Sequence, residues 1–188
     1  MKRPTFNNFP SLSSERLDFR PLRMTDRNEI YRLRSDEIIL KYLNLPVAKN
    51  LKDAEDFIEM VENGTAANKW ITWGMCLKNS DTIIGTICLW NCDFETESAE
   101  VGYGLLPEFH QRGFMSETMK FTLDIGFNTF GFQEIDAITD CNNIGSRKLL
   151  EKFDFELDDK FESEETGSVR YFLVNRSNAN TNVNGTRV

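Results

Sequence analysis

The sequence predicts an α+β or α/β domain built around one β-sheet. Runs of strand-forming residues alternate along the chain with segments that carry the apolar spacing of helices, so the two kinds of element are intermixed. The chain has 188 residues, the size of a single domain, and its fifteen Phe and three Trp supply large apolar groups for a core. Residues 14–175 should form this domain, after a lead-in at 1–13 and before a disordered tail rich in Asn, Ser and Thr at 176–188.

Strands are expected where polar and apolar residues alternate or where strand formers are concentrated. The expected strands are 16–22, 71–77, 82–90, 99–106, 134–139, 155–161 and 169–174. Short polar connections separate the second, third and fourth strands, so these three should form an antiparallel meander. The last two strands should form a closing pair.

Helices are expected where apolar residues recur at the spacing of one helical face. One should run from Asp26, as its N-cap, to about Leu33, and a second should begin after Asp53 and end at Gly64. A third carries an apolar residue at every fourth position, namely Met115, Met119, Leu123 and Phe127. A fourth should span 144–153.

The overall charge and the distribution of apolar residues restrict the class of protein. The net charge of −8 argues against nucleic acid as the main partner and is compatible with cationic substrates. The chain has no apolar run of about 18 residues, so we expect no transmembrane helix and no membrane partner. The basic N-terminus is followed by Asn and Ser rather than by an apolar stretch, which indicates a cytoplasmic protein without a secretion signal.

Four cysteines, at 76, 88, 92 and 141, form no CxxC pair and have no nearby His in the sequence. We therefore expect free thiols in a reducing compartment, with neither a disulfide framework nor a metal site.

The most informative segment is 107–117, with the sequence PEFHQRGFMSE. It joins a predicted strand to a predicted helix through a basic, glycine-containing loop. Unpaired N–H groups and the macrodipole make a helix N-terminus electropositive, and Gly113 lets the backbone approach an anion closely. The segment therefore predicts a site for a phosphate group.

The strand before this loop has an unusual face. Side chains alternate along a strand, so Glu100, Gly102 and Gly104 share one side, which offers a carboxylate beside two bare backbone positions. Glycines inside a strand often mark a bulge or the close approach of a ligand. The structural alternative is a helix packed on the glycines, with Glu100 as a solvated charge.

The helix after residue 142 offers a second candidate site. Ser146 lies at the edge of an apolar stripe, and Asn143 lies one turn earlier. The structural alternative is that an Asn caps the helix and Ser146 bonds locally to the backbone. His110 is the only histidine, and its place in the loop suits contact with an anion or simple exposure to solvent better than activation of a nucleophile.

Three segments in register resemble the GNAT acyl-CoA N-acetyltransferases, in the branch of RimJ/RimL-type ribosomal-protein N-terminal acetyltransferases. They are Ser14 to Leu22, Ala99 to Glu117, and Asn143 to Phe155, and the resemblance spans roughly residues 12–175. It implies a single GNAT-type domain with a mixed, mostly antiparallel sheet between helices, splayed in the middle to form an acetyl-CoA cleft.

The resemblance also implies which residues bind acetyl-CoA as co-substrate. Backbone N–H groups of the loop should bind the pyrophosphate, strand amides should pair with the pantetheine arm, and Asn143 should contact that arm from the other side. The loop residues are Gln111, Arg112, Gly113, Phe114, Met115 and Ser116, and the strand residues are Tyr103, Leu105 and Leu106.

A mechanism follows from the chemistry of thioester aminolysis. The attacking amine must be neutral, although an α-amino group has a pKa near 8 and a lysine near 10.4. Glu100 is expected to take the proton as the general base. A strand amide near Leu105 should stabilise the oxyanion, and Ser146 should serve the departing thiolate.

Four positions depart from the wider superfamily pattern. His110 and Met115 replace commoner residues at the two ends of the loop, and Asp154 replaces a common Gly. Leu150 stands where many relatives carry a Tyr that acts as general acid, so a phenol is excluded at that position.

The expected acceptor is a protein N-terminus, with a polyamine or an aminoglycoside as the alternative. A non-catalytic acyl-CoA-binding module is the alternative from another class, and a homodimer is a family-level expectation only.

Overall fold

An eight-stranded mixed sheet forms the centre of the fold, in a computed structural model that describes residues 5–6, 12–43, 46–162 and 167–176. The strand order is β1-β2-β3-β4-β5-β6-β8-β7. The strands are β1 Leu12–Ser13, β2 Leu17–Arg20, β3 Ile71–Leu77, β4 Ile83–Asp93, β5 Ser98–Leu105, β6 Glu134–Asp140, β7 Glu156–Leu157 and β8 Ser168–Val174. All neighbours are antiparallel except β5 and β6, which are parallel.

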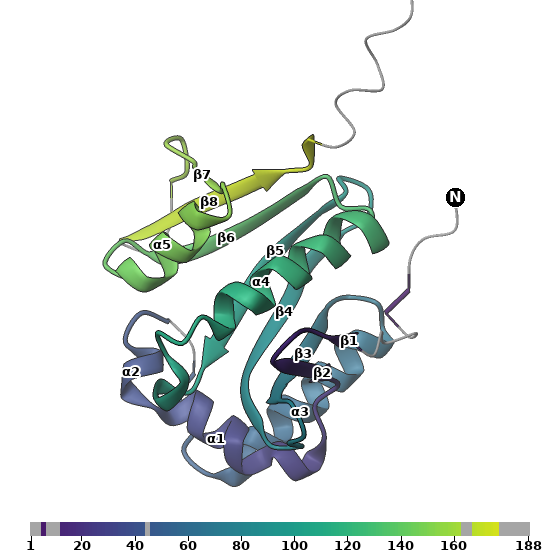
Figure 1. Ribbon diagram of the computed structural model, residues 1–188, viewed down its shortest axis with the longest axis vertical. Coiled ribbons are helices and arrows are strands. Elements are labelled where there is room, and N and C mark those ends of the chain that lie inside the picture. Colours follow the sequence, from purple (N-terminus) through teal and green to yellow (C-terminus); the bar gives the residue numbers. More distant parts are fainter. Residues whose placement is uncertain (1–4, 7–11, 44–45, 163–166, 177–188) are drawn as a thin grey trace, which may run out of the picture.

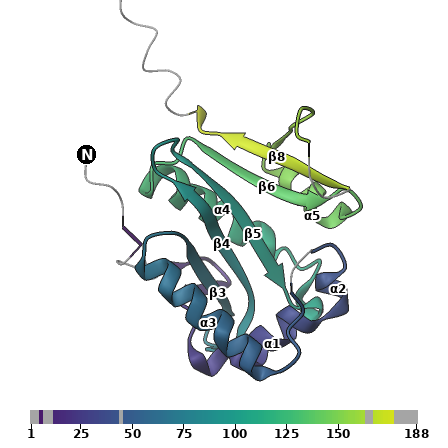
Figure 2. The ribbon, with the colours of Figure 1, turned by 180° about the vertical axis from the view of Figure 1, so that it is seen from behind.

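Helices cover both faces of this sheet, which gives the three layers expected from the sequence (Figures 1 and 2). They are the 3-10 turn η1 Met24–Asp26, α1 Arg27–Ser35, α2 Glu37–Leu40, α3 Leu51–Ala66, the 3-10 turn η2 Pro107–Phe109, α4 Phe114–Asp124, a π-helical turn Ile125–Thr129 and α5 Ile144–Lys152. None of the helices in the described part of the chain is long and apolar enough to cross a membrane.

The feature that positions the site is the separation of β5 from β6. The parallel ladder holds only Ser98 to Glu100 against Glu134 to Asp136. Beyond this point β5 continues along β4 and β6 continues along β8. Figures 1 and 2 show the resulting V, closed at one end and open at the other. Five residues of β5 therefore present one edge of their backbone to the opening.

Two apolar cores hold the layers together. The larger packs the sheet against α4 and includes Trp73, Met119 and Ile135, all fully buried. The smaller packs α1 and α3 through Ile30 and Ile58. Burial of large side chains on both faces is the main stabilising contribution to such a layered domain.

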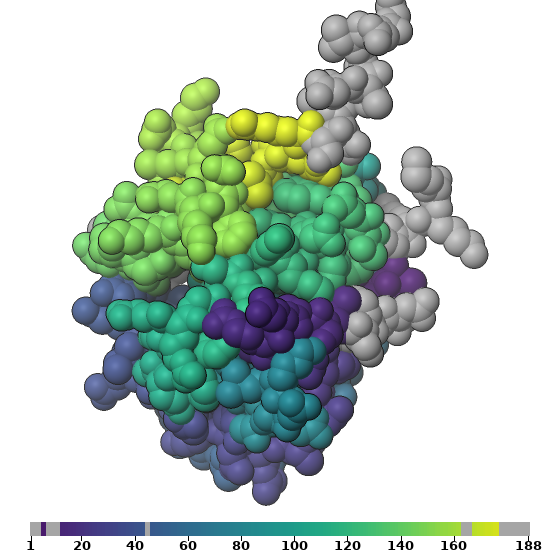
Figure 3. Space-filling view, viewed as in Figure 1, coloured from purple at the N-terminus to yellow at the C-terminus, as the bar shows by residue number. Residues whose placement is uncertain are grey.

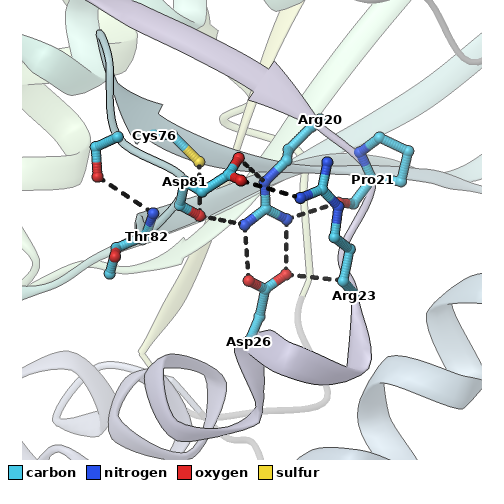
Figure 4. Close-up of polar contacts among 8 residues, drawn as sticks. Arg20, Pro21, Arg23, Asp26, Cys76, Asp81 and Thr82 are labelled. Atoms are coloured by element: carbon cyan, nitrogen blue, oxygen red, sulfur yellow. Dashed lines mark hydrogen bonds and ion pairs between the residues drawn. The ribbon is translucent and has the colours of Figure 1, made fainter.

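A buried ion pair connects β2 to the helices on the second face (Figure 4). The Arg20 guanidinium donates to both carboxylate oxygens of Asp26 at 2.7 and 2.8 Å, and also to the carbonyl of Asp81 in the β3–β4 turn. Asp26 also accepts from the backbone N–H of Arg23 at 2.7 Å. Asp26 thus stands at the predicted N-cap of α1, but its carboxylate binds β2 rather than capping the helix.

Several predicted boundaries are wrong. Gly64 lies inside α3 instead of ending it. Its glycine is explained by packing, because a Cβ at this position would fall 1.8 Å from the Trp70 ring. The predicted strand 155–161 is reduced to two residues, since the chain turns at Asp158. The short elements β1 and α2 carry too few residues to show a period and were not expected. All but the first residue of the predicted tail lies outside the described residues.

Candidate active site

Glu100 lies at the point where β5 and β6 separate. It is the last β5 residue paired with β6, where its partner is Asp136, and it pairs with Trp90 on the other side. Only 7% of its surface is exposed, so the alternative of a solvated strand-end charge is wrong. A carboxylate placed there has little water around it, so its charged form is less stable and its affinity for a proton is higher.

A β-bulge in β4 brings a hydrogen-bond donor to this carboxylate. The register between β4 and β5 shifts between Trp90 and Asp93, and Asn91 adopts a positive φ of 47° there. Its side chain then donates from Nδ2 to Oε2 of Glu100 at 3.1 Å. Bulges often redirect a side chain next to a functional site, and here the redirected group fixes the orientation of Glu100.

Charged residues of β6, of β8 and of the turn after β7 lie near the same point. Arg170 donates to Asp136 at 2.7 Å, to Asp158 at 3.0 Å and to Glu134 at 2.5 Å. The single cation is therefore shared among three carboxylates. Asp136 keeps enough negative charge to repel Glu100.

These surroundings raise the pKa of Glu100 to about 7. Burial is the largest cause, because it removes water from the charged form, and repulsion by Asp136 acts in the same direction. The hydrogen bond from Asn91 and the charge of Arg170 partly oppose the rise. A carboxylate with a pKa near neutrality is suited to accept and release a proton at physiological pH.

The two glycines of β5 behave differently. A Cβ at Gly102 would lie 3.1 Å from Cys88 Sγ, so this position is filled by the neighbouring strand. A Cβ at Gly104 would meet nothing within 4 Å, so open space borders the backbone there. Only Gly104 therefore leaves room for the close approach of a ligand.

The β5 amides alternate between β4 and the opening. The N–H of Leu106 donates to the carbonyl of Ile84 at 2.9 Å, which directs this amide toward β4. Alternation along the strand directs the N–H groups of Tyr103 and Leu105 toward the opening instead. Two of the three expected strand amides thus face the opening, and the expectation for the Leu106 amide is wrong.

The loop after β5 ends in a helix start without a side-chain cap. Gly113 is the N-cap residue of α4 and adopts a φ of 78°, and Gln111 also has a positive φ. Since glycine has no side chain, it cannot satisfy the N–H groups of the first turn, which are available to an anion. Phe114 is buried, whereas Gln111 and Arg112 are exposed.

Arg16 connects this loop to β2. Its Nε donates to Glu117 at 2.7 Å, its backbone N–H donates to the same carboxylate at 2.9 Å, and its Nη1 donates to the Arg112 carbonyl at 2.9 Å. The guanidinium also lies 4.6 Å from the centre of the Phe114 ring. In the space-filling view the purple N-terminal strands lie against the green surface of α4 (Figure 3).

The remaining residues of the loop contact α5, the larger core and the end of β5. Ser116 accepts a hydrogen bond from Nζ of Lys152, at the end of α5, at 3.1 Å. Met115 packs against the larger core. The exposed ring of His110 bonds through Nε2 to the carbonyl of Leu105 at 2.7 Å, so it lies at the end of β5.

On α5, Asn143 is the N-cap, and its Oδ1 accepts from the backbone N–H of Ser146 at 3.1 Å. This confirms the capping alternative for Asn143, and it leaves Nδ2 as the side-chain group that could donate to a ligand. The Ser146 hydroxyl bonds to the Tyr103 hydroxyl at 2.8 Å, not to local backbone. Leu150 is fully buried in the core.

Glu100 and Ser146 approach the opening from opposite faces of the sheet. Tyr103 points to the face covered by α4 and α5, where it packs against the larger core and meets Ser146. Glu100 is an odd number of residues away on the same strand, so its side chain points to the other face. A carboxylate and a hydroxyl group thus stand on the two sides of one opening.

Three residues around Glu100 were not identified from the sequence, namely Asn91, Asp136 and Arg170. The polar residue Asn91 at the end of an apolar strand was a usable signal for a bulge. The positions of Asp136 and Arg170 depend on strand order, which the sequence does not display. In the described ranges, no group of three or more His, Cys, Asp or Glu side chains is arranged to hold a metal ion.

Residues 16–156 match the family model described as an acetyltransferase (GNAT) domain. Among curated proteins, the uncharacterized N-acetyltransferase p20 of Bacillus licheniformis is 29% identical over 146 residues, which cover 78% of this chain and 82% of that protein. Among solved structures, the ribosomal-protein-S5-alanine acetyltransferase from Vibrio fischeri has a TM-score of 0.77 at 18% identity, over 89% of this chain and 98% of that one. RimL, an α-N-protein acetyltransferase of ribosomal L7/L12 solved with coenzyme A, has a TM-score of 0.74 at 13% identity, over 86% and 95%.

Proposed function

The chain belongs to the GNAT acetyltransferase family, and we propose that it moves an acetyl group from acetyl-CoA to the α-amino group of a protein N-terminus. The enzyme class follows from the family and from the N-acetyltransferases that it resembles. The observation that carries the proposed mechanism is the buried carboxylate of Glu100, with a pKa of about 7, at the point where β5 and β6 part.

The opening between β5 and β6 fits acetyl-CoA in three respects. The amides of Tyr103 and Leu105 face it, Gly104 leaves space beside it, and the uncapped start of α4 at Gly113 suits a pyrophosphate. In our proposal the loop residues Gln111, Arg112, Gly113, Phe114, Met115 and Ser116 contact the pyrophosphate, and Nδ2 of Asn143 contacts the pantetheine arm. RimL, which has a similar fold, was solved in complex with coenzyme A, and this supports coenzyme A as the class of cofactor.

Glu100 acts as the general base. It takes a proton from the ammonium form of the acceptor and passes it to water, and the neutral nitrogen then forms the new C–N bond with the acetyl carbonyl carbon. Glu100 takes the second proton from this nitrogen as the tetrahedral intermediate collapses. The C–S bond breaks and its electron pair stays on sulfur. An amide near Leu105 stabilises the negative charge on the carbonyl oxygen, and the Ser146 hydroxyl donates a hydrogen bond to the leaving sulfur. The proton on Glu100 then passes to water.

The lower pKa of an α-ammonium favours an α-amine over a lysine as the acceptor. Proton transfer to a carboxylate with a pKa of about 7 is uphill by roughly one pKa unit from an α-ammonium of pKa near 8, and by more than three from a lysine of pKa near 10.4. Each unit lowers the fraction of productive complexes about tenfold. The similar structure from Vibrio fischeri, named for ribosomal protein S5, agrees with a protein acceptor.

Thiol release from acetyl-CoA by the purified protein tests the proposal. The acceptor panel contains N-terminal peptides, the same peptides with a blocked α-amine and one free lysine, polyamines and aminoglycosides. Release stimulated by the free α-amines is expected. Release stimulated only by blocked peptides, polyamines or aminoglycosides would contradict the proposed acceptor. If the protein binds acetyl-CoA but no acceptor of the panel stimulates thiol release, the result would favour a non-catalytic binding module.

Glu100→Gln tests the base, and Glu62→Gln, at an exposed position of α3, is the matched control. The Glu100 variant should keep its affinity for acetyl-CoA and lose about 10²-fold or more in kcat/KM near neutral pH. The loss should shrink above about pH 9, where an α-amine is neutral without help. An unchanged rate at every pH would remove Glu100 from the mechanism.

A further inference from the structure

The phenol of Tyr103 has no part in the mechanism so far, although it bonds directly to the Ser146 hydroxyl. The O–O distance is 2.8 Å, and the bond joins β5 to the first turn of α5 across 43 residues of sequence. Both side chains are half-buried. Because of this bond, Tyr103 can influence the orientation of the Ser146 hydroxyl.

The direction of this bond decides what Ser146 can offer. Burial raises the pKa of Tyr103 to about 12, so its O–H stays protonated at every working pH. A phenol is a stronger acid than an aliphatic alcohol, so the favoured arrangement has the Tyr103 O–H donating to Ser146 Oγ. The hydrogen of Ser146 is then available for another acceptor.

Ser146 is held at a second point. Its backbone N–H donates to Oδ1 of Asn143 at 3.1 Å, which fixes the first turn of α5. With the backbone held by Asn143 and the hydroxyl held by Tyr103, little rotational freedom remains in the side chain. Such support by neighbouring groups is what gives a functional side chain a single productive geometry.

We propose that Tyr103 is a positioning residue, which orients the Ser146 hydroxyl so that its O–H points at the sulfur of the leaving group. The inference rests on the proposed function, because it assigns a role within the same transfer reaction. In this proposal Tyr103 places a phenol near the leaving group from β5, whereas many relatives carry a Tyr at the position that Leu150 occupies on α5.

The proposed role requires hydrogen bonding but no net proton transfer from Tyr103. When the C–S bond breaks, the electron pair remains on sulfur as a thiolate. A thiol of pKa near 8.5 is a far stronger acid than a tyrosine of pKa about 12, so the thiolate does not remove the phenol proton. The Ser146 O–H stabilises the thiolate, which takes a proton from water after release.

The test uses Tyr103→Phe, Ser146→Ala and the double variant. Tyr171→Phe is the matched control, because the Tyr171 hydroxyl also bonds to α5, through Arg147 Nε at 3.0 Å and Glu151 Oε1 at 3.1 Å. Removing it tests the structural effect of losing a phenol that holds the same helix. The measurements are kcat with an active acceptor, and the dissociation constant of acetyl-CoA by calorimetry.

Tyr103→Phe should lower kcat about tenfold or more, because the unheld Ser146 hydroxyl loses much of its hydrogen bond to the charged sulfur, and it should change the dissociation constant less than about threefold. Tyr171→Phe should match wild type in both. The double variant should be no slower than Ser146→Ala, because Tyr103 acts through Ser146.

Two results would overturn the inference while leaving the proposed function intact. One is a Tyr103→Phe enzyme with the kcat of wild type. The other is a Tyr103→Phe defect that is equally large in the Ser146→Ala background, which would show that the phenol acts independently. A wild-type protein without acceptor-stimulated thiol release would instead reject the proposed function, and the inference with it.

Discussion

Glu100 and Asp136 are the last register partners of the parallel ladder between β5 and β6, and the two strands separate immediately beyond them. The fold thus places two carboxylates side by side at the apex of the opening. Their repulsion raises the pKa of Glu100, while Asn91 and Arg170 limit the rise. This balance of neighbours makes the pKa of Glu100 adjustable by single substitutions.

Asp136→Asn should lower the pKa of Glu100. The substitution removes the repelling charge and leaves more of the Arg170 charge to act on Glu100, and both effects favour the ionised carboxylate. The acid limb of the pH profile of kcat/KM should therefore move from about pH 7 to lower pH by about half a unit to one unit. An unchanged limb would show that another group sets it.

Asn91→Gly should move the same limb in the opposite direction. The variant loses the hydrogen bond that stabilises the Glu100 carboxylate, so its pKa should rise by about half a unit to one unit. Glycine is the suitable replacement because position 91 has a positive φ of 47°, which glycine adopts without strain. Shifts of the same sign in the Asn91 and Asp136 variants would contradict this account of the site.

Glu100→Gln should make the protein more stable at high pH. The folded state raises the pKa of Glu100 from 4.5 to about 7, so it binds the proton more tightly than the unfolded chain does. Wild type therefore loses stability as the pH rises from 4.5 to about 7, and it regains none above. The variant should exceed wild type by up to about 3 kcal/mol in unfolding free energy at pH 8, and by almost nothing at pH 4. Urea unfolding at both pH values measures this, and a larger gain at pH 4 would contradict it.

Arg16→Ala should weaken acetyl-CoA binding through the loop. The variant loses the side-chain bonds to Glu117 and to the Arg112 carbonyl that hold the start of α4 against β2. Its dissociation constant should rise about fivefold, with kcat at saturating acetyl-CoA nearly unchanged. Arg27→Ala is the control, since Arg27 forms a similarly exposed ion pair with Glu55 away from the loop. Equal affinities in the two variants would show that the Arg16 contacts do not support acetyl-CoA binding.

Gly64→Ala and Gly145→Ala should have opposite effects on stability. Both glycines lie inside helices, where alanine is normally favoured by up to about 1 kcal/mol. At Gly64 a Cβ would overlap the Trp70 ring, so the variant should lose roughly 1–3 kcal/mol from overpacking. At Gly145 the nearest atom lies 3.7 Å away, so alanine should stabilise. Thermal unfolding of both variants distinguishes these signs.

The sequence predicted the elements that carry a clear period or a distinct composition. The meander of β3, β4 and β5 and the span of α5 are confirmed to within three residues at every end, and the apolar stripe of α4 is confirmed as well. The start of α4 at Gly113 was also predictable, because the loop carries its own local signals. Helix α3 was predicted too short, since tertiary packing of Gly64 against Trp70 overrides the usual effect of glycine.

The sequence by itself determined the fold class, the candidate anion-binding loop and the candidates Glu100 and Ser146, because local spacing and local composition encode all of these. Only the tertiary structure decided what surrounds them. The bulge at Asn91, the pairing of Glu100 with Asp136 and the bond from Tyr103 to Ser146 each join residues from different elements. Strand order and burial bring these groups together, and burial next to a like charge is what moves the pKa of Glu100 to about 7.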